Sequence, residues 1–213
     1  MEYRIKISPG RRSVGLRAAP DGVIEIVAPI ALPPEVISRL LYRHRRALAN
    51  MLSAVKKFSF ADGETFFYRG KSYPVSASQR LLCFTGELFL LPPGDDAARR
   101  AGLEKLYRRL AEQYILPRAA ETAEKYGFKP EKLKISSAAT RYGSCSASGV
   151  CRFSWRLIQY PDELIDLVIA HELSHLKVMN HSAGFYRELQ RISPDFALLQ
   201  QKMKLFSRNN RLL

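Results

Sequence analysis

Three of the chain's four histidines lie within eleven consecutive residues. Residues 171–181 read HELSHLKVMNH, so His171 and His175 frame an HExxH motif and His181 follows six residues later. On a helix, residues four apart lie about 40° apart around the axis and one turn apart along it, so both imidazoles can face one metal ion. The spacing therefore predicts a metal site with His171 and His175 as ligands.

The residue between these ligands suggests the chemistry. Glu172 is rotated by about 100° from His171 around the same helix, so it cannot be a third ligand but can reach a water molecule held by the metal. A catalytic site of this kind needs a third protein ligand and an open fourth position. His181 can be that ligand if the chain reverses after the helix, and Asn180 tolerates the left-handed backbone that such reversals often need.

The donor set favours zinc. Imidazole nitrogens suit Zn²⁺, although they also suit nickel, copper and iron. A zinc ion lowers the pKa of its water toward neutrality, so the expected reaction is metal-assisted hydrolysis with Glu172 moving a proton from the attacking water to the leaving group. Carboxylates available to orient the imidazoles are Asp166, Glu188 and Asp195.

The first region of the chain, residues 1–92, is predicted to be β-rich with one basic helix. Apolar and basic residues alternate over residues 3–8, and further runs around an Asp21-Gly22 turn indicate antiparallel strands. Pro33-Pro34 predicts the start of a helix of about 24 residues. Pro92-Pro93-Gly94 marks the predicted boundary.

The second region, residues 95–213, holds the predicted catalytic site, and the two regions can also pack as one domain. Residues 95–126 predict a long helix that Pro117 kinks or breaks. Residues 133–137 and 150–157 read as strands. Pro161 begins the helix that carries the HExxH motif.

The charge of the chain is strongly positive. Its 213 residues include 34 Lys+Arg and 20 Asp+Glu, a formal net charge of +14. Such an excess is typical of proteins that contact nucleic acid or nucleotides, and equally of proteins with a basic solvated surface. The most concentrated basic face of the predicted first helix carries Arg39, Arg43 and Arg46, and here too a solvated face is the alternative to a phosphate-binding surface.

The sequence predicts a cytoplasmic protein without membrane contact. No apolar run reaches the roughly 18 to 20 residues of a bilayer-spanning helix, and the first residues lack the apolar core of a secretory signal. The three cysteines are an odd number, scattered along the chain, which indicates reduced thiols. Nothing in the sequence indicates an oligomeric state.

Several motifs in order resemble those of the YgjP-like metallopeptidase family, which is related to the SprT-like and WLM zincin groups. They are RYGSC at 141–145, SWRL at 154–157, HELSHL at 171–176 and MNHSAGFY at 179–186. The resemblance implies zinc ligands at His171, His175 and His181 and a catalytic Glu172. It also implies an α+β fold, with a β-rich N-terminal part followed by a zincin-like helical metallopeptidase core with a short antiparallel sheet.

The same resemblance suggests where a substrate would bind. In zincin folds a strand beside the metal helix pairs with an extended peptide, and residues 141–144 or 150–156 are the candidates. Arg141, Ser144 and Arg156 are the predicted substrate contacts, and the two arginines would hold an anionic intermediate or a phosphate. Solvated charges or structural ion pairs are the alternative. The chain departs from the family at Tyr142 and Ser154, where Trp and Asn are usual.

The sequence thus predicts a zinc-dependent hydrolase, with a metallopeptidase acting on peptides or proteins as the leading hypothesis. The first alternative is a metal-dependent phosphohydrolase acting on nucleotides, because a metal-activated water attacks phosphorus as well. The second is a nucleic-acid-associated zinc protein, against which Glu172 argues, since a structural metal needs no general base.

Overall fold

A computed structural model of the chain describes residues 2–18, 23–54, 60 and 62–210. Residue contacts divide the chain into two units, Met1–Phe58 and Ser59–Leu213. This division differs from the predicted boundary at 92–95, because the strands between residues 65 and 91 belong to the second unit. Their link to the next helix is direct: the Tyr107 hydroxyl donates a hydrogen bond to the Phe67 carbonyl, and the Tyr107 and Phe89 rings lie 5.5 Å apart.

The first unit contains a three-stranded sheet in the order β1-β3-β2. The strands are β1 (Tyr3–Ile7), β2 (Gly15–Ala18) and β3 (Ile24–Ala28). The central strand, β3, pairs antiparallel with β2 and parallel with β1. The prediction of antiparallel strands is therefore wrong for β1, because β2 intervenes in the chain and β3 returns beside β1 in the same direction. The predicted Asp21-Gly22 turn lies outside the described residues.

Two helices follow where one was predicted. They are α1 (Pro34–Arg43) and α2 (Arg45–Ala54), and His44 caps the first. The interruption lets Ile37 from α1 and Leu48 from α2 reach one core with two β3 isoleucines, Ile24 and Ile26. The predicted basic residues Arg39, Arg43 and Arg46 are exposed on these helices.

The second unit begins with a four-stranded sheet in the order β4-β5-β7-β6. Its strands are β4 (Thr65–Tyr68), β5 (Lys71–Ala77), β6 (Cys83–Phe84) and β7 (Phe89–Leu91). The long helix α3 (Asp96–Tyr126) follows, with Asp95 as its N-cap and left-handed Gly127 as its C-cap. Pro117 lies inside α3 and does not end it.

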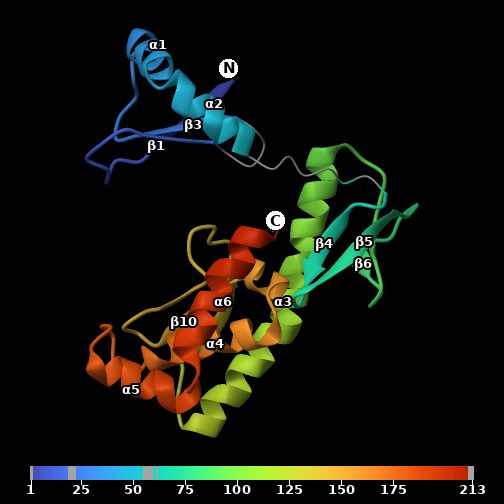
Figure 1. Cartoon of the computed structure of the whole chain (residues 1–213), viewed down its shortest axis with the longest axis vertical. Helices are drawn as coiled ribbons and strands as arrows, with labels where there is room; N and C mark the ends of the chain where they lie inside the picture. Colours follow the sequence, from blue (N-terminus) through green and yellow to red (C-terminus); the bar gives the residue numbers. More distant parts are fainter. Residues whose placement is uncertain (1, 19–22, 55–59, 61, 211–213) are drawn as a thin grey trace. The chain divides into compact units, whose positions relative to one another are not determined.

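A second sheet supports the metal-binding motif. It contains β8 (Lys132–Ser136), β9 (Gly143–Cys145) and β10 (Val150–Ser154) in the order β8-β10-β9. The predicted strand at 150–157 ends at Ser154, where a short 3-10 helix, η1 (Trp155–Gln159), begins. The helices α4 (Asp162–Ser174), α5 (Ala183–Ile192) and α6 (Phe196–Asn209) complete the unit (Figure 1).

The predicted α+β class is confirmed, with one difference in the sheet that was expected to be antiparallel. Only β9 pairs antiparallel with the central β10, whereas β8 pairs parallel with it. The 13-residue connection between β8 and β10 contains β9, which gives the chain room to return in the same direction. Within the described part of the chain, no helix combines the length and apolar character needed to cross a membrane.

Candidate metal centre

The helix α4 carries the HExxH motif through the core of the second unit. Pro161 precedes it, and Asp162 and Glu163 place negative charge at its first turn, where the helix dipole favours it. Nearly every later position is buried, including Leu164, Ile165, Leu167, Val168, Ile169 and Ala170. Because α4 is packed on most sides, the histidine positions at its end are held by core packing.

The three predicted ligands come together at the end of α4. One ring nitrogen each of His171, His175 and His181 can be chosen so that all lie within 4.8 Å of one another. The Nε2 atoms of His171 and His181 are 3.2 Å apart. The chain reverses between α4 and α5, but Asn180 is not left-handed, since Arg69 is the sole described non-glycine residue with a positive φ.

One aromatic ring contacts all three imidazoles. Phe185, fully buried in the first turns of α5, has its ring centroid 4.9 Å from that of His171 and 4.6 Å from those of His175 and His181. Phe185 also packs against Ala170 of α4. Phe185 therefore packs α5 onto α4 and contacts the three predicted ligands as well.

The protonation of the imidazoles suits metal binding. Nδ1 of His175 lies 3.2 Å from the Val178 carbonyl, which can only accept, so Nδ1 carries the proton and Nε2 is free to coordinate. Burial, together with the neighbouring imidazoles, lowers the pKa of His171 to about 4. Burial also lowers the pKa of His175. Three imidazoles converging at this spacing fit a zinc ion, whose usual ligands include histidine nitrogens.

Glu172 lies between the metal helix and strand β9. Glu172 is 5% exposed. Burial raises the pKa of its carboxyl to about 7, although the positive charge of Arg141 lowers this pKa. No described residue donates a hydrogen bond to this carboxylate. A buried acid with a raised pKa and without a partner is typical of a group that handles protons.

Gly143 of β9 makes room for Glu172. A Cβ atom at position 143 would lie 2.6 Å from both Cγ and Oε1 of Glu172, closer than real Cβ contacts allow. Only glycine therefore lets the glutamate take this position against the strand. Gly143 was part of the RYGSC motif, but its contact joins residues 29 positions apart in the chain and spacing along a helix could not reveal it.

A pocket of about 300 Å³ adjoins His171 and Glu172. Its apolar wall comes from Leu167 and Val168 of α4 and Met203 of α6, and its polar lining includes Arg141 and Gln200. Sequence reasoning missed the α6 residues, since nothing in their spacing to the motif indicates that α6 packs beside α4.

Hydroxyl groups tie α6 to the segment before β9. The Ser207 hydroxyl lies 2.8 Å from the Tyr142 hydroxyl and 2.6 Å from that of Tyr160, and the Tyr160 hydroxyl donates to Tyr142 at 3.0 Å. The departure from the family at Tyr142 therefore supplies a hydroxyl to this cluster. The other departure, Ser154, donates from its hydroxyl to the Ala138 carbonyl at 2.6 Å.

The predicted substrate contacts separate into two groups. Arg141 lines the pocket beside Glu172, and Ser144 lies on the edge strand β9. Arg156 is elsewhere: its guanidinium lies over the Trp155 ring and donates to the Ser137 carbonyl at 3.3 Å. The structure therefore brings Arg141 to the metal site and places Arg156 against other elements.

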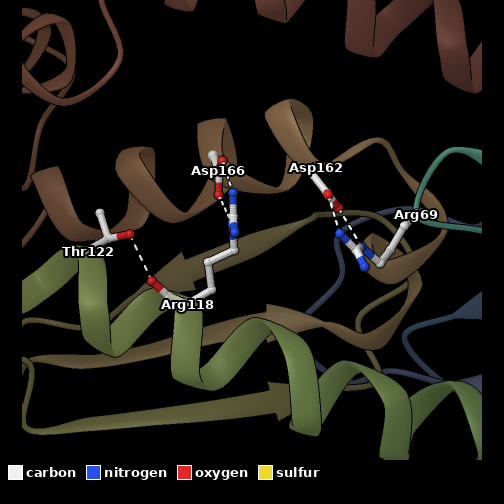
Figure 2. A network of polar contacts seen from close by, with 5 residues as sticks. All are labelled: Arg69, Arg118, Thr122, Asp162 and Asp166. Carbon is white, nitrogen blue, oxygen red and sulfur yellow. Dashed lines mark hydrogen bonds and ion pairs between the residues drawn. The ribbon is translucent and has the colours of Figure 1, made fainter.

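Two ion pairs fix α4 from the side that faces α3 and the β4–β5 turn (Figure 2). Arg118 of α3 pairs with Asp166, and Arg69 pairs with Asp162 one helical turn away. Glu188 pairs with Lys177 and Arg191. The candidate carboxylates Asp166 and Glu188 are thus engaged by cations, and no described imidazole forms a hydrogen bond with either of them or with Asp195.

Two imidazoles at the end of a core helix and a third from the turn after it, beside a buried carboxylate, are the arrangement expected of metal-dependent hydrolases. The family model of the YgjP-like metallopeptidase domain matches residues 12–206, so the chain belongs to this family of metallopeptidases, as its motifs predicted. A comparison with curated proteins finds no match.

Two solved structures are similar to part of the chain. The metallopeptidase zymogen abylysin of Pyrococcus abyssi has 18% identity and a TM-score of 0.39, covering 42% of this chain and 90% of that one. The metallopeptidase zymogen jannalysin of Methanocaldococcus jannaschii has 20% identity and a TM-score of 0.39, covering 43% and 94%.

Proposed function

We propose that this protein is a zinc-dependent peptidase in which His171, His175 and His181 hold the metal and Glu172 is the general base. The observation that carries the proposal is the convergence of the three ring nitrogens within 4.8 Å, next to a buried carboxylate. When bound, zinc supplies a Lewis acid that polarises the substrate carbonyl and acidifies water.

The chain's own residues would then move the proton. Glu172, whose pKa is raised to about 7, accepts a proton from the attacking water and returns it to the leaving amine. Gly143 keeps its carboxylate against β9, and the neutral imidazole of His171 offers its lone pair instead of a positive charge. Arg141 is placed to stabilise negative charge that develops on the substrate.

The edge strand β9 supports an extended peptide as substrate. Ser154 N–H donates to the Tyr142 carbonyl, and Ser146 N–H donates to the Val150 carbonyl. In an antiparallel ladder, hydrogen-bonded and non-hydrogen-bonded residue pairs alternate, and residues of the non-hydrogen-bonded pairs turn their N–H and C=O groups away from the partner strand. On β9 these residues are Gly143 and Cys145, so their backbone groups face the free edge. A peptide could add to this edge beside Glu172, with one of its side chains in the 300 Å³ pocket.

The test uses Glu172→Gln in the zinc-loaded protein. A mixture of unstructured peptides and, separately, nucleoside triphosphates are incubated with both proteins, and products are read by mass spectrometry and phosphate release. We expect peptide cleavage by the wild type and a loss of about 100-fold or more in the variant, with zinc content unchanged. Phosphate release that depends on Glu172, without peptide cleavage, would favour the phosphohydrolase alternative and overturn the proposal.

A further inference from the structure

The arginine that lies away from the metal pocket is part of a second polar cluster. Arg156 is half-buried on η1, and its guanidinium stacks over the ring of Trp155, 4.2 Å from the ring centroid. Trp155 is 2% exposed, so it is a fixed platform. Stacking and the bond to the Ser137 carbonyl hold the plane of the guanidinium.

Helix α3 contributes three more charged groups to this cluster. Arg100, Glu104 and Arg108 follow one another at intervals of four residues, so they lie on one face of the helix. Arg100 Nε donates to Glu104 Oε1 at 3.2 Å. Arg108 donates to the Ser137 hydroxyl, the same residue whose carbonyl accepts from Arg156. Arg108 and Arg156 therefore meet at Ser137 from two different elements.

The charges of this cluster do not balance. Arg108 and Arg156 meet at Ser137, and neither forms an ion pair with a carboxylate of the described residues. Burial lowers the pKa of Arg156, and the nearby charges of Arg100 and Arg108 lower it further, whereas Glu104 raises it. Holding like charges together at a half-buried position costs free energy, which a bound anion would recover.

We propose that Arg108, Arg156 and the Ser137 hydroxyl form a binding site for a phosphate group, separate from the proposed metal centre. Guanidinium groups present forked N–H donors that match the oxygens of phosphate, and two arginines converging from different elements can contact a tetrahedral anion on two sides. The site does not depend on the proposed peptidase activity, because none of these residues lines the pocket beside Glu172. Free phosphate and a phosphate ester would present the same dianionic group.

The test measures phosphate binding to the zinc-loaded protein by calorimetry, with thermal unfolding as a second readout. Titrations with inorganic phosphate and with a nucleoside monophosphate, at constant ionic strength, distinguish the two sources of the group. We expect saturable binding at one site, and Arg156→Gln and Arg108→Gln should each weaken it by about tenfold or more, since each removes a charge-assisted hydrogen bond.

The matched control is Arg109→Gln, which removes an exposed arginine next to Arg108 in the chain whose guanidinium donates to the Leu82 carbonyl. This variant should bind phosphate as the wild type does. If Arg156→Gln does not fold, the phosphate affinity of Arg108→Gln alone tests the proposal. The proposal is overturned if phosphate does not bind, or if the control variant weakens binding as much as the cluster variants do. It is also overturned if both cluster variants still bind phosphate, because the anion then lies at the metal.

Discussion

The polar side chains on two sides of the helix α4 differ in whether they have hydrogen-bond or ion-pair partners. On the side facing α3 and the β4–β5 turn, Asp162 and Asp166 each have an arginine partner. On the side facing β9 and α5, no described residue donates a hydrogen bond to the carboxylate of Glu172, and the Nε2 atoms of His171 and His181 lie 3.2 Å apart. Satisfied groups position the helix, whereas unsatisfied groups indicate where a ligand belongs.

The largest effect should come from removing a ligand on the unsatisfied side. His171→Ala in the proposed zinc site leaves two imidazoles, so stoichiometric zinc should be lost together with hydrolysis. Metal analysis of the purified protein checks this, with His44→Ala as the control because His44 is exposed in the first unit. Unchanged zinc in His171→Ala and in His175→Ala would remove the proposed site.

A smaller but still large effect should follow from crowding Glu172. Gly143→Ala places a methyl group where the Glu172 side chain lies, so the carboxylate must move. A displacement of about 1 Å can cost about 100-fold in rate, and we expect a fall of that order in kcat with zinc content unchanged. Gly102→Ala is the control, because its new Cβ would meet Leu82 at an ordinary 3.6 Å. Full activity in Gly143→Ala would contradict the role assigned to this glycine.

The pocket on the same side should respond to a bulkier wall. Met203→Trp fills part of the 300 Å³ space, so peptides that place a large side chain there should lose about tenfold in kcat/KM relative to peptides with alanine. Leu205→Trp, at a 56% exposed position of the same helix, should leave this ratio unchanged. The ratio is measured by competition between paired peptides, and an equal loss for both peptides would indicate general damage.

The smallest effect should come from the side of α4 whose carboxylates pair with arginines, and this effect on stability should depend on pH. The hydrogen bond from Arg69 is the main cause that lowers the pKa of Asp162, so the folded state favours the ionised carboxylate. The stabilisation is therefore present above the unfolded pKa of about 3.9 and is lost as pH falls through the lower folded value. Asp162→Asn should cost less than about 1 kcal/mol at pH 7, because the pair is partly exposed.

Thermal unfolding from pH 7 down to pH 3 tests this, with Glu163→Gln as the control. Glu163 is exposed on the same first turn, so it reports the helix dipole without the Arg69 pair. The difference between Asp162→Asn and the wild type should narrow as the solution becomes more acidic. A difference that widens at low pH would show that Asp162 does not act through its ionised form.

The two sides also differ in how much of them the sequence could predict. The relative positions of His171, Glu172 and His175 were predictable, because the spacing of residues along a helix determines which way their side chains point. Their neighbours Gly143 and Met203 were not, because these contacts depend on how β9 and α6 pack against α4. The same reason explains why the sequence could not choose among the available carboxylates, of which the fold turns Asp166 toward Arg118.

Local signals had similar limits elsewhere. Pro117 predicts a kink or a break, and the structure excludes the break: the surrounding residues keep α3 continuous, with Ile115 and Ala119 buried on either side. The strand predicted through Leu157 ends earlier because Ser154 caps η1, accepting from Arg156 N–H. In both places tertiary packing decides an outcome that the local pattern leaves open.

The ring of Phe185 packs against every histidine of the proposed metal centre. Its ring contacts all three imidazoles, although two of them come from the end of α4 and one from the turn before α5. A tilt of α5 would therefore shift the ring and His181 together relative to His171 and His175, so the packing of Phe185 against Ala170 of α4 fixes the spacing of the three imidazoles. Exchange of a bound ion would then require α5 to come away from α4, so the rate of metal loss should rise with temperature as steeply as a local unfolding step does.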